Sequence, residues 1–137
     1  MSNVDLADRV ALSPTPCLRR VKRLEGEGII ERYRAELNRE KLGFGITAFV
    51  HVNIERHTPE ATRRFVDSVN KIDEVVGCHI LTGSFDFLLE VVAETLEAYS
   101  TVMLERLGAL PGVSALQTSF ALKSTKRGQA LPLHHPG

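Results

Sequence analysis

The chain has 137 residues, of which 43% are hydrophobic and 25% charged, a composition typical of one full globular domain plus a smaller one. Lysine and arginine number 17, as do aspartate and glutamate, so the net charge alone indicates no polyanionic partner. The charges are unevenly placed, because residues 1–41 carry nine cations against seven acids and residues 42–122 carry five against ten. This asymmetry is expected if only the N-terminal part meets a polyanion.

Several classes of protein are disfavoured. No apolar run is long enough to cross a bilayer and no signal-peptide core is present, so we expect a cytoplasmic protein without a membrane partner. Cys17 and Cys78 lack the spacing of metal ligands, which predicts reduced thiols, no metal site and no cofactor. Because no catalytic triad, carboxylate pair or phosphate loop stands out, we expect that the protein is not an enzyme.

Residues 2–11 predict a short first helix. Ser2 can cap its N-terminus, with Asp5 three residues later, and an apolar stripe ends near Ala11. A turn of about three residues then leads to the next helix, which is the spacing of a helix-turn-helix unit. Two short helices joined tightly also occur in helical proteins of other kinds.

Residues 13–25 predict a second helix with an apolar face and a basic face. Ser13 is a suitable N-cap, and Pro14 suits the first helical position, where an N–H would have no intrahelical partner. The polar side carries a threonine and four cations: Thr15, Arg19, Arg20, Lys22 and Arg23. From these residues alone, a solvated surface helix and a helix that enters the major groove of DNA are equally good interpretations.

Residues 29–37 predict a strand after the helix ends at Gly26 and Gly28. Apolar residues alternate along it, beginning at Ile29, while Arg32 and Arg34 point to the other side. Such a strand is typical of the wing of a winged helix, where the two arginines could reach phosphates. Charged residues then cluster before Gly43, which indicates a connector between two domains.

Residues 45–122 follow the order strand, helix, strand, strand, helix, strand. Strands are predicted over residues 45–55, 75–82, 85–93 and 113–122. In the first strand, alternation with a period of two predicts one core face, which carries Ile46, Ala48, Val50, Val52 and Ile54. Thr58 and Thr95 cap the helices, and Gly83-Ser84 suits a two-residue hairpin turn. The second helix is expected to turn Leu96, Tyr99, Met103, Leu107 and Leu110 inward. This order is the split β-α-β motif of ferredoxin-like folds, with both helices on one face of an antiparallel sheet.

The other face of that sheet is expected to have no helix over it. Phe49 and His51 lie there, and they must either meet water or pack on another copy of the chain. A mixed apolar and polar face fits a symmetric homodimer. The tail over residues 123–137 is polar and then rich in proline and histidine, and we expect it to be poorly ordered.

Five motifs in this chain occur in a distinctive order. They are LSPTPC over residues 12–17, VKRLE over 21–25, GII over 28–30, CHILTGSFDFLL over 78–89 and LPGV over 110–113. Their order and spacing resemble the leucine-responsive and asparagine-responsive regulators of prokaryotic transcription, the Lrp/AsnC family. The resemblance covers nearly the whole chain.

The resemblance implies an α+β protein in which a winged helix-turn-helix head over residues 1–37 is joined by a connector over residues 38–44 to a ferredoxin-like regulatory domain over residues 45–122. Family members carry a further helix before the position of Ser2, so the head is expected to be truncated. The implied function is sequence-specific binding of double-stranded DNA, modulated by a small effector that is usually an amino acid. Homodimers are expected to assemble further, often into octamers, with effectors bound where dimers meet. A truncated head leaves an alternative, a stand-alone amino-acid-sensing and oligomerisation module that does not bind DNA.

The resemblance also implies site residues. The expected DNA contacts are Ser13, Thr15, Arg19, Arg20, Lys22 and Arg23, with Arg32 and Arg34 of the wing. The expected effector site is Gly83, Ser84, Phe85 and Asp86, with Thr118 as a weaker candidate. There, backbone N–H groups of the turn would receive an effector carboxylate while Asp86 meets its ammonium. Taken alone, the same residues favour a plain hairpin in which Asp86 hydrogen-bonds the turn.

Overall fold

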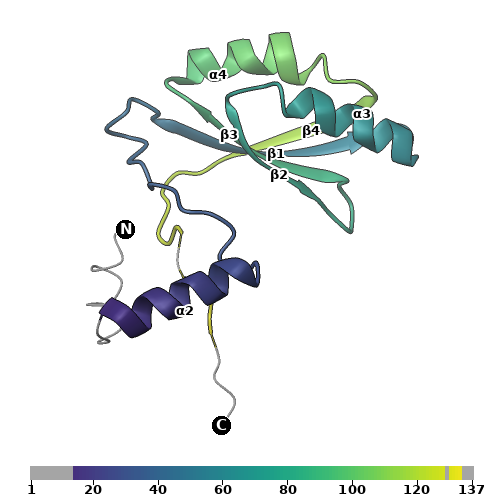
Figure 1. The fold of residues 1–137 in the computed structure, drawn as a ribbon. Coiled ribbons are helices and arrows are strands. Elements are labelled where there is room, and N and C mark those ends of the chain that lie inside the picture. Colours follow the sequence, from purple (N-terminus) through teal and green to yellow (C-terminus); the bar gives the residue numbers. More distant parts are fainter. Residues whose placement is uncertain (1–13, 129, 134–137) are drawn as a thin grey trace. The chain divides into compact units, whose positions relative to one another are not determined.

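A computed structural model of the protein describes residues 14–128 and 130–133 (Figure 1). The chain divides after Leu37 into two compact units. The predicted first helix over residues 2–11 and the cap at Ser13 lie outside the described residues. Within the described ranges, no helix is both long and apolar enough to span a membrane.

The first unit contains the helix α2, Pro14–Gly26, close to the predicted bounds. Cys17 and Val21, one helical turn apart, are buried on its apolar side, and Ile30 packs against them after the chain has turned back. That turn depends on Gly28, whose φ of 77° is easily reached only without a Cβ, and it is closed by the Ile30 N–H donating to the Leu24 carbonyl at 3.1 Å. Sequence periodicity therefore identified the correct face.

The predicted wing strand is wrong for the isolated chain. Residues 31–37 form neither helix nor strand, and the apolar side chains of Ile29, Tyr33 and Leu37 are exposed. The alternation of side chains is real, but an extended segment becomes a strand only when a neighbouring strand accepts and donates its backbone hydrogen bonds. No described residue of this chain pairs with it.

The second unit is built on a four-stranded antiparallel sheet with strand order β2-β3-β1-β4. The strands are β1 Ile46–Ile54, β2 Val75–Ile80, β3 Phe87–Ala93 and β4 Val113–Phe120. The helices are α3, Pro59–Val69, and α4, Leu96–Val102, which continues as the π-helical turn η1, Met103–Leu107. Both helices lie over the same face of the sheet (Figure 1), which is the predicted ferredoxin-like arrangement in an α+β fold.

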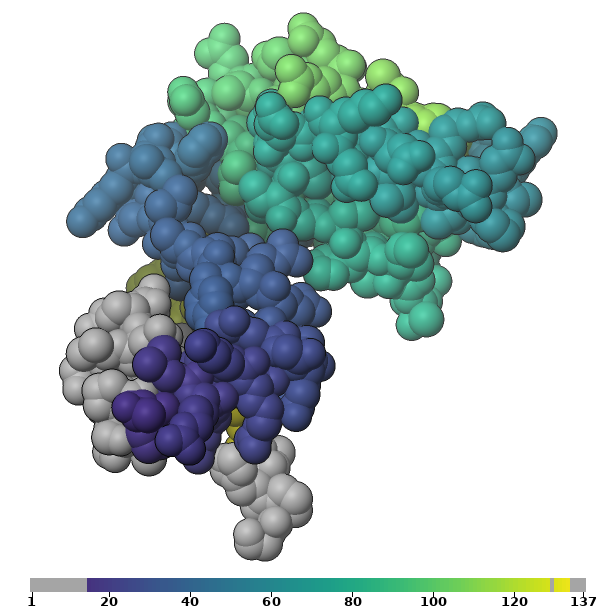
Figure 2. All heavy atoms as spheres, in the orientation of Figure 1, coloured from purple at the N-terminus to yellow at the C-terminus, as the bar shows by residue number. Residues whose placement is uncertain are grey.

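The core lies between this helical layer and the sheet. Alternate residues of β1, namely Ala48, Val50 and Val52, are fully buried, as the period of two predicted. Phe65 of α3 stacks on Phe87 of β3 with ring centroids 4.3 Å apart. In the space-filling view, α3 in teal and α4 in green cover this face as neighbouring parts of one surface (Figure 2). The opposite face, called the open face below, carries Phe49, His51 and their neighbours across the strands.

Thr58 and Thr95 cap the two helices as predicted, accepting the backbone N–H of Ala61 at 3.1 Å and of Ala98 at 3.0 Å. The expectation that Leu96 points inward is wrong, because its side chain is 58% exposed and Tyr99, one turn later, fills the inward position. The π-helical turn then shifts the periodicity, so that Leu107 is buried while Leu104 is exposed.

The hairpin between β2 and β3 is longer than the predicted two-residue turn. Strand β2 ends at Ile80 and β3 starts at Phe87, and the Leu81 N–H donates to the Asp86 carbonyl at 2.8 Å to close the loop. Strand β4 also ends two residues early, at Phe120. The described part of the tail, residues 123–128 and 130–133, contains neither helix nor strand.

Candidate functional site

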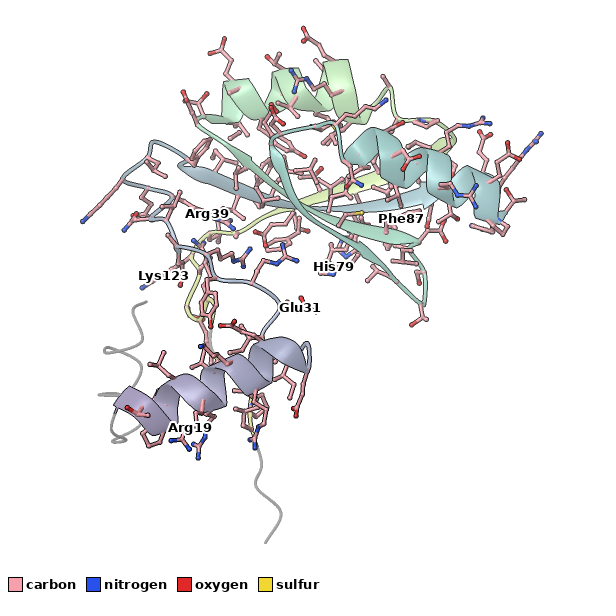
Figure 3. All side chains as sticks on the ribbon, in the orientation of Figure 1. Arg19, Glu31, Arg39, His79, Phe87 and Lys123 are labelled. Carbon is pink, nitrogen blue, oxygen red and sulfur yellow. The ribbon has the colours of Figure 1, made fainter. Side chains whose placement is uncertain are left out.

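The basic face of α2 is presented to solvent. Because Cys17 and Val21 are buried, the other side of the helix faces outward, and five side chains on it are exposed: Thr15, Arg19, Arg20, Lys22 and Arg23. Figure 3 shows Arg19 projecting away from the helix. Among the described residues, none of the four cations forms an ion pair with a carboxylate. Their charges are therefore available to an external anion.

Arg32 and Arg34 do not occupy a wing in this structure. Both side chains are exposed on a segment that forms no strand, and Arg32 lies 4.0 Å from the carboxylate of its neighbour Glu31. A contact this long between exposed groups contributes little to stability. Their role as phosphate contacts stays a prediction.

The loop over residues 81–86 places a row of backbone donors at the end of the hairpin. Gly83 has φ of 106°, a conformation that side chains with a Cβ rarely adopt. Thr82, Gly83 and Ser84 are exposed, and within the described chain the N–H groups of Gly83, Ser84 and Phe85 have no hydrogen-bond acceptor. Exposed backbone N–H groups at a turn can donate to a carboxylate.

Asp86 anchors this loop to the end of β1. Its carboxylate oxygen Oδ2 accepts the Ile54 N–H at 2.9 Å and lies 3.0 Å from Nε2 of His57. Its own N–H donates to the carbonyl of Val52 and to Oδ1 of Asn53, both at 3.0 Å. The Asp86 carbonyl closes the turn by accepting the Leu81 N–H, but the partners of its carboxylate and of its N–H belong to β1 and to the loop before α3, so the carboxylate does not bond its own turn.

These bonds keep the Asp86 carboxylate ionised. The Ile54 N–H holds the pKa of Asp86 below its usual range, partial desolvation opposes this effect, and His57 adds to the lowering. His57 was missed by sequence reasoning, because it lies 29 residues from Asp86 on an exposed loop and belongs to no motif. One carboxylate oxygen, Oδ1, has no donor among the described residues.

Phe85 turns toward the open face of the sheet. Its ring lies against that of His51 on β1, with centroids 4.9 Å apart and planes tilted by 47°. The buried Nδ1 of His51 has no hydrogen-bond partner in the described structure. Phe85 therefore packs beneath the loop, while Gly83 and Ser84 form its exposed tip.

Thr118 lies apart from the loop. It is on β4, opposite Val50 of β1, on the face that the helices cover. Its hydroxyl is 2.8 Å from that of Tyr99 on α4, and burial raises the pKa of Tyr99. The structure thus brings Gly83, Ser84, Phe85 and Asp86 together but gives Thr118 a separate packing role within one chain.

The described residues contain no group of three or more potential metal ligands. Cys17 and Cys78 are both free, in separate units of the chain, and burial raises the pKa of the Cys78 thiol. Two separate candidate sites are left: the cations on α2 in the first unit, and the backbone donors with the Asp86 carboxylate in the second.

Both units of the chain are similar to known proteins. Residues 47–131 match the family model of the Lrp/AsnC ligand binding domain, and residues 1–31 match that of a winged helix-turn-helix DNA-binding domain. The leucine-responsive regulatory proteins of Klebsiella pneumoniae and of Escherichia coli K12 are each 39% identical to this chain over 131 residues, which is 96% of the chain and 80% of each relative.

Solved structures give the same result. A transcriptional regulator from Neisseria meningitidis in complex with L-methionine is 43% identical, with a TM-score of 0.86 over 96% of this chain and 85% of that one. An AsnC family regulator from Agrobacterium tumefaciens is 32% identical, with a TM-score of 0.85 over 96% and 86%. A feast or famine regulatory protein from M. tuberculosis complexed with L-methionine is 26% identical, with a TM-score of 0.76 over 96% and 87%.

Proposed function

The chain belongs to the Lrp/AsnC family of DNA-binding transcriptional regulators, and from this premise we propose that the basic face of α2 binds the operator while the loop over residues 83–86 binds an amino acid. The alternative of a sensing module without DNA binding is not supported, because the winged helix-turn-helix match spans residues 1–31 and the regulators align over 96% of the chain. The homology also supports regulation rather than enzymatic catalysis.

We base DNA binding on one observation: the four cations on α2 are exposed, and none of them pairs with a carboxylate within residues 14–128 and 130–133. Arginine can donate two parallel hydrogen bonds to a guanine edge, whereas lysine acts mainly as a point charge toward phosphate. Thr15, near the start of the helix, is placed to touch a base or a thymine methyl group. The burial of Cys17 and Val21 on the opposite side supports the basic face as the one that would meet the groove.

The effector site follows from the charges of an amino acid. Its carboxylate would accept the free N–H groups of Gly83, Ser84 and Phe85, and its ammonium would meet Oδ1 of Asp86. L-Methionine is the first effector to test, because two of the related regulators are described in complex with it. The lowered pKa of Asp86 supports this role, since it extends to more acidic pH the range in which the carboxylate is ionised while the ammonium is charged.

Assembly of several chains would bury apolar surface that is exposed in a single chain. The open face of the sheet and the exposed apolar side chains of Ile29, Tyr33 and Leu37 are surfaces that a second copy could cover in a two-fold dimer. Further association of dimers, up to an octamer, would bring the exposed tips of the effector loops to subunit boundaries. An effector then changes DNA affinity by favouring one assembly, with a coupling typically of about 1 to 3 kcal/mol.

The test begins with DNA selected by the purified protein from a random-sequence duplex pool. Anisotropy titrations of a selected duplex and of a scrambled duplex should show tight and weak binding respectively, and L-methionine should shift the first curve at least five-fold. Isothermal calorimetry should detect L-methionine binding to the protein alone. Failure to enrich any sequence would contradict the DNA-binding proposal, and absence of both the shift and the heat would contradict L-methionine as the effector.

A further inference from the structure

The connector over residues 38–44 is folded onto the regulatory unit. The Lys41 N–H donates to Oδ1 of Asn38 at 3.0 Å, and the Phe44 N–H donates to the Arg39 carbonyl at 2.8 Å. Gly43 has φ of 92°, which lets the chain reverse sharply before β1. This segment is a hydrogen-bonded turn, so it does not behave as a free tether.

Arg39 fastens that turn to the open face of the sheet. Its Nη2 lies 2.6 Å from Oε2 of Glu90 on β3, and its Nη1 donates to Oγ1 of Thr47 on β1 at 3.2 Å. Figure 3 shows Arg39 at the sheet, where the turn meets the strands. The Arg39 and Glu90 side chains are only 25% and 29% exposed, so salt screens this pair less than a surface pair.

Glu90 connects the Arg39 contact to β3, the strand that follows the effector loop. It lies on β3, four residues after Asp86 in the sequence, and it is opposite Phe49 of β1 and Gly77 of β2. Strand β3, Phe87–Ala93, runs without a break from the end of the effector loop to Glu90, so the loop and the Arg39 contact share one strand.

The flexible part of the linkage must then lie before Asn38. Residues 31–37 form neither helix nor strand, and Tyr33 in this segment donates its hydroxyl to Glu25 of α2 at 2.7 Å. That contact is exposed, so water competes with it and all of residues 31–37 count as tether. The tether is consequently about seven residues long, and release of residues 38–44 would double it.

We propose that Arg39 is a positioning residue that couples the effector loop to DNA binding by fixing where the tether of the head leaves the sheet. The inference rests on the function proposed above and adds a residue that touches neither DNA nor effector. Doubling a flexible tether lowers the effective concentration of a second linked head by about 3-fold, from the −3/2 power of its length. Loss of the Arg39 contacts with Glu90 and Thr47 should therefore weaken binding to a selected duplex by about this factor. It should also remove the effect of the effector on DNA affinity.

The experiment compares Arg39→Ala with Arg106→Ala in the full chain. Arg106 makes an ion pair with Glu74 at 2.9 Å in the same unit, so it controls for general loss of an arginine. Hydrogen exchange should be at least ten-fold faster at the amides of residues 41–44 in Arg39→Ala and unchanged there in Arg106→Ala. Arg39→Glu combined with Glu90→Arg should restore protection if the pair itself is the cause.

The functional measurement is the ratio of DNA affinities with and without L-methionine. For Arg39→Ala this ratio should become about 1, while the Arg106→Ala ratio should stay at the wild-type value. Calorimetry should show that Arg39→Ala binds L-methionine with an affinity within two-fold of wild type. Unchanged exchange at residues 41–44, or an unchanged ratio, would overturn the inference. If the ratio is 1 for the wild-type protein, the effector proposal fails instead. The role of Arg39 is then decided by hydrogen exchange at residues 41–44 and by whether Arg39→Ala binds DNA about 3-fold more weakly.

Discussion

Replacement of Asp86 separates two roles that this carboxylate combines. It accepts the N–H of Ile54, a residue only 5% exposed, and in the proposed complex it also meets an ammonium. Asp86→Ala removes both functions. Asp86→Asn keeps an oxygen acceptor of the same shape and removes only the charge, so the two variants should differ.

The magnitudes follow from the contacts. In Asp86→Ala the buried Ile54 N–H loses its acceptor, which costs about 1 to 3 kcal/mol of unfolding free energy, while the exposed His57 can turn to water. Asp86→Asn exchanges a charged hydrogen bond for a neutral one, which costs about 1 kcal/mol. For L-methionine binding, both variants should lose at least ten-fold in affinity, because neither offers a charge to the ammonium.

Urea denaturation followed by circular dichroism measures the first effect, and calorimetry measures the second. Asp67→Asn, an exposed aspartate of α3, is the matched control and should be neutral in both assays. If Asp86→Asn folds with nearly wild-type stability and binds L-methionine as wild type does, the ammonium contact is refuted. If Asp86→Ala is as stable as wild type, the anchoring role is refuted.

The pH dependence of stability gives an independent check. The pKa of Asp86 is lowered in the folded protein, so its contribution is fully present above the unfolded pKa of about 4 and is lost as the pH falls through the lower folded value. Between these two pKa values, the stability of wild type should therefore decline more steeply with falling pH than that of Asp86→Asn. Parallel profiles for the two proteins in this acid range would contradict the assignment.

Two further predictions concern the core and the assembly. Phe65→Ala should lower the unfolding free energy by about 3 to 5 kcal/mol in urea denaturation, because Phe65 is fully buried against Phe87, whereas Leu122→Ala, at a fully exposed position, should change it by less than about 0.5 kcal/mol. Ala115→Glu places a charge on an exposed position of the open face, where it would oppose packing of a second copy. Light scattering should therefore report monomers, while circular dichroism shows a folded chain. The control Thr101→Glu, on the exposed side of α4, should leave a dimer. A dimer that survives Ala115→Glu would exclude the open face around β4 as the interface.

Local sequence patterns were sufficient to predict the helices and strands whose packing and hydrogen-bond partners lie within the same chain. The period of two in β1 identified Ala48, Val50 and Val52 as core, and threonine caps located the starts of α3 and α4. The wing strand failed for a physical reason, since alternation in residues 29–37 marks one side of the segment as apolar but supplies no neighbouring strand to hydrogen-bond its backbone.

The contacts that hold the candidate site together could not be found from spacing. Asp86 and Ile54 are 32 residues apart, and Arg39 and Glu90 are 51 apart, so their pairing depends on the register of β1 with β3. The family resemblance named the loop residues because they form a continuous motif. It did not name His57, which lies beside Asp86 only when the sheet has formed, or Arg39, which then contacts Glu90 on β3.

Binding of DNA by the basic face of α2 is decided by a salt titration of a charge-reversed protein. Affinity of wild type for a selected duplex should fall steeply with salt, and Arg19→Glu combined with Arg23→Glu should weaken binding and reduce the slope of log affinity against log salt by about 2. Arg63→Glu combined with Lys71→Glu, exposed cations of the other unit, should leave both quantities at the wild-type value. Equal affinities and equal slopes for wild type and the α2 variant would contradict DNA binding through this helix.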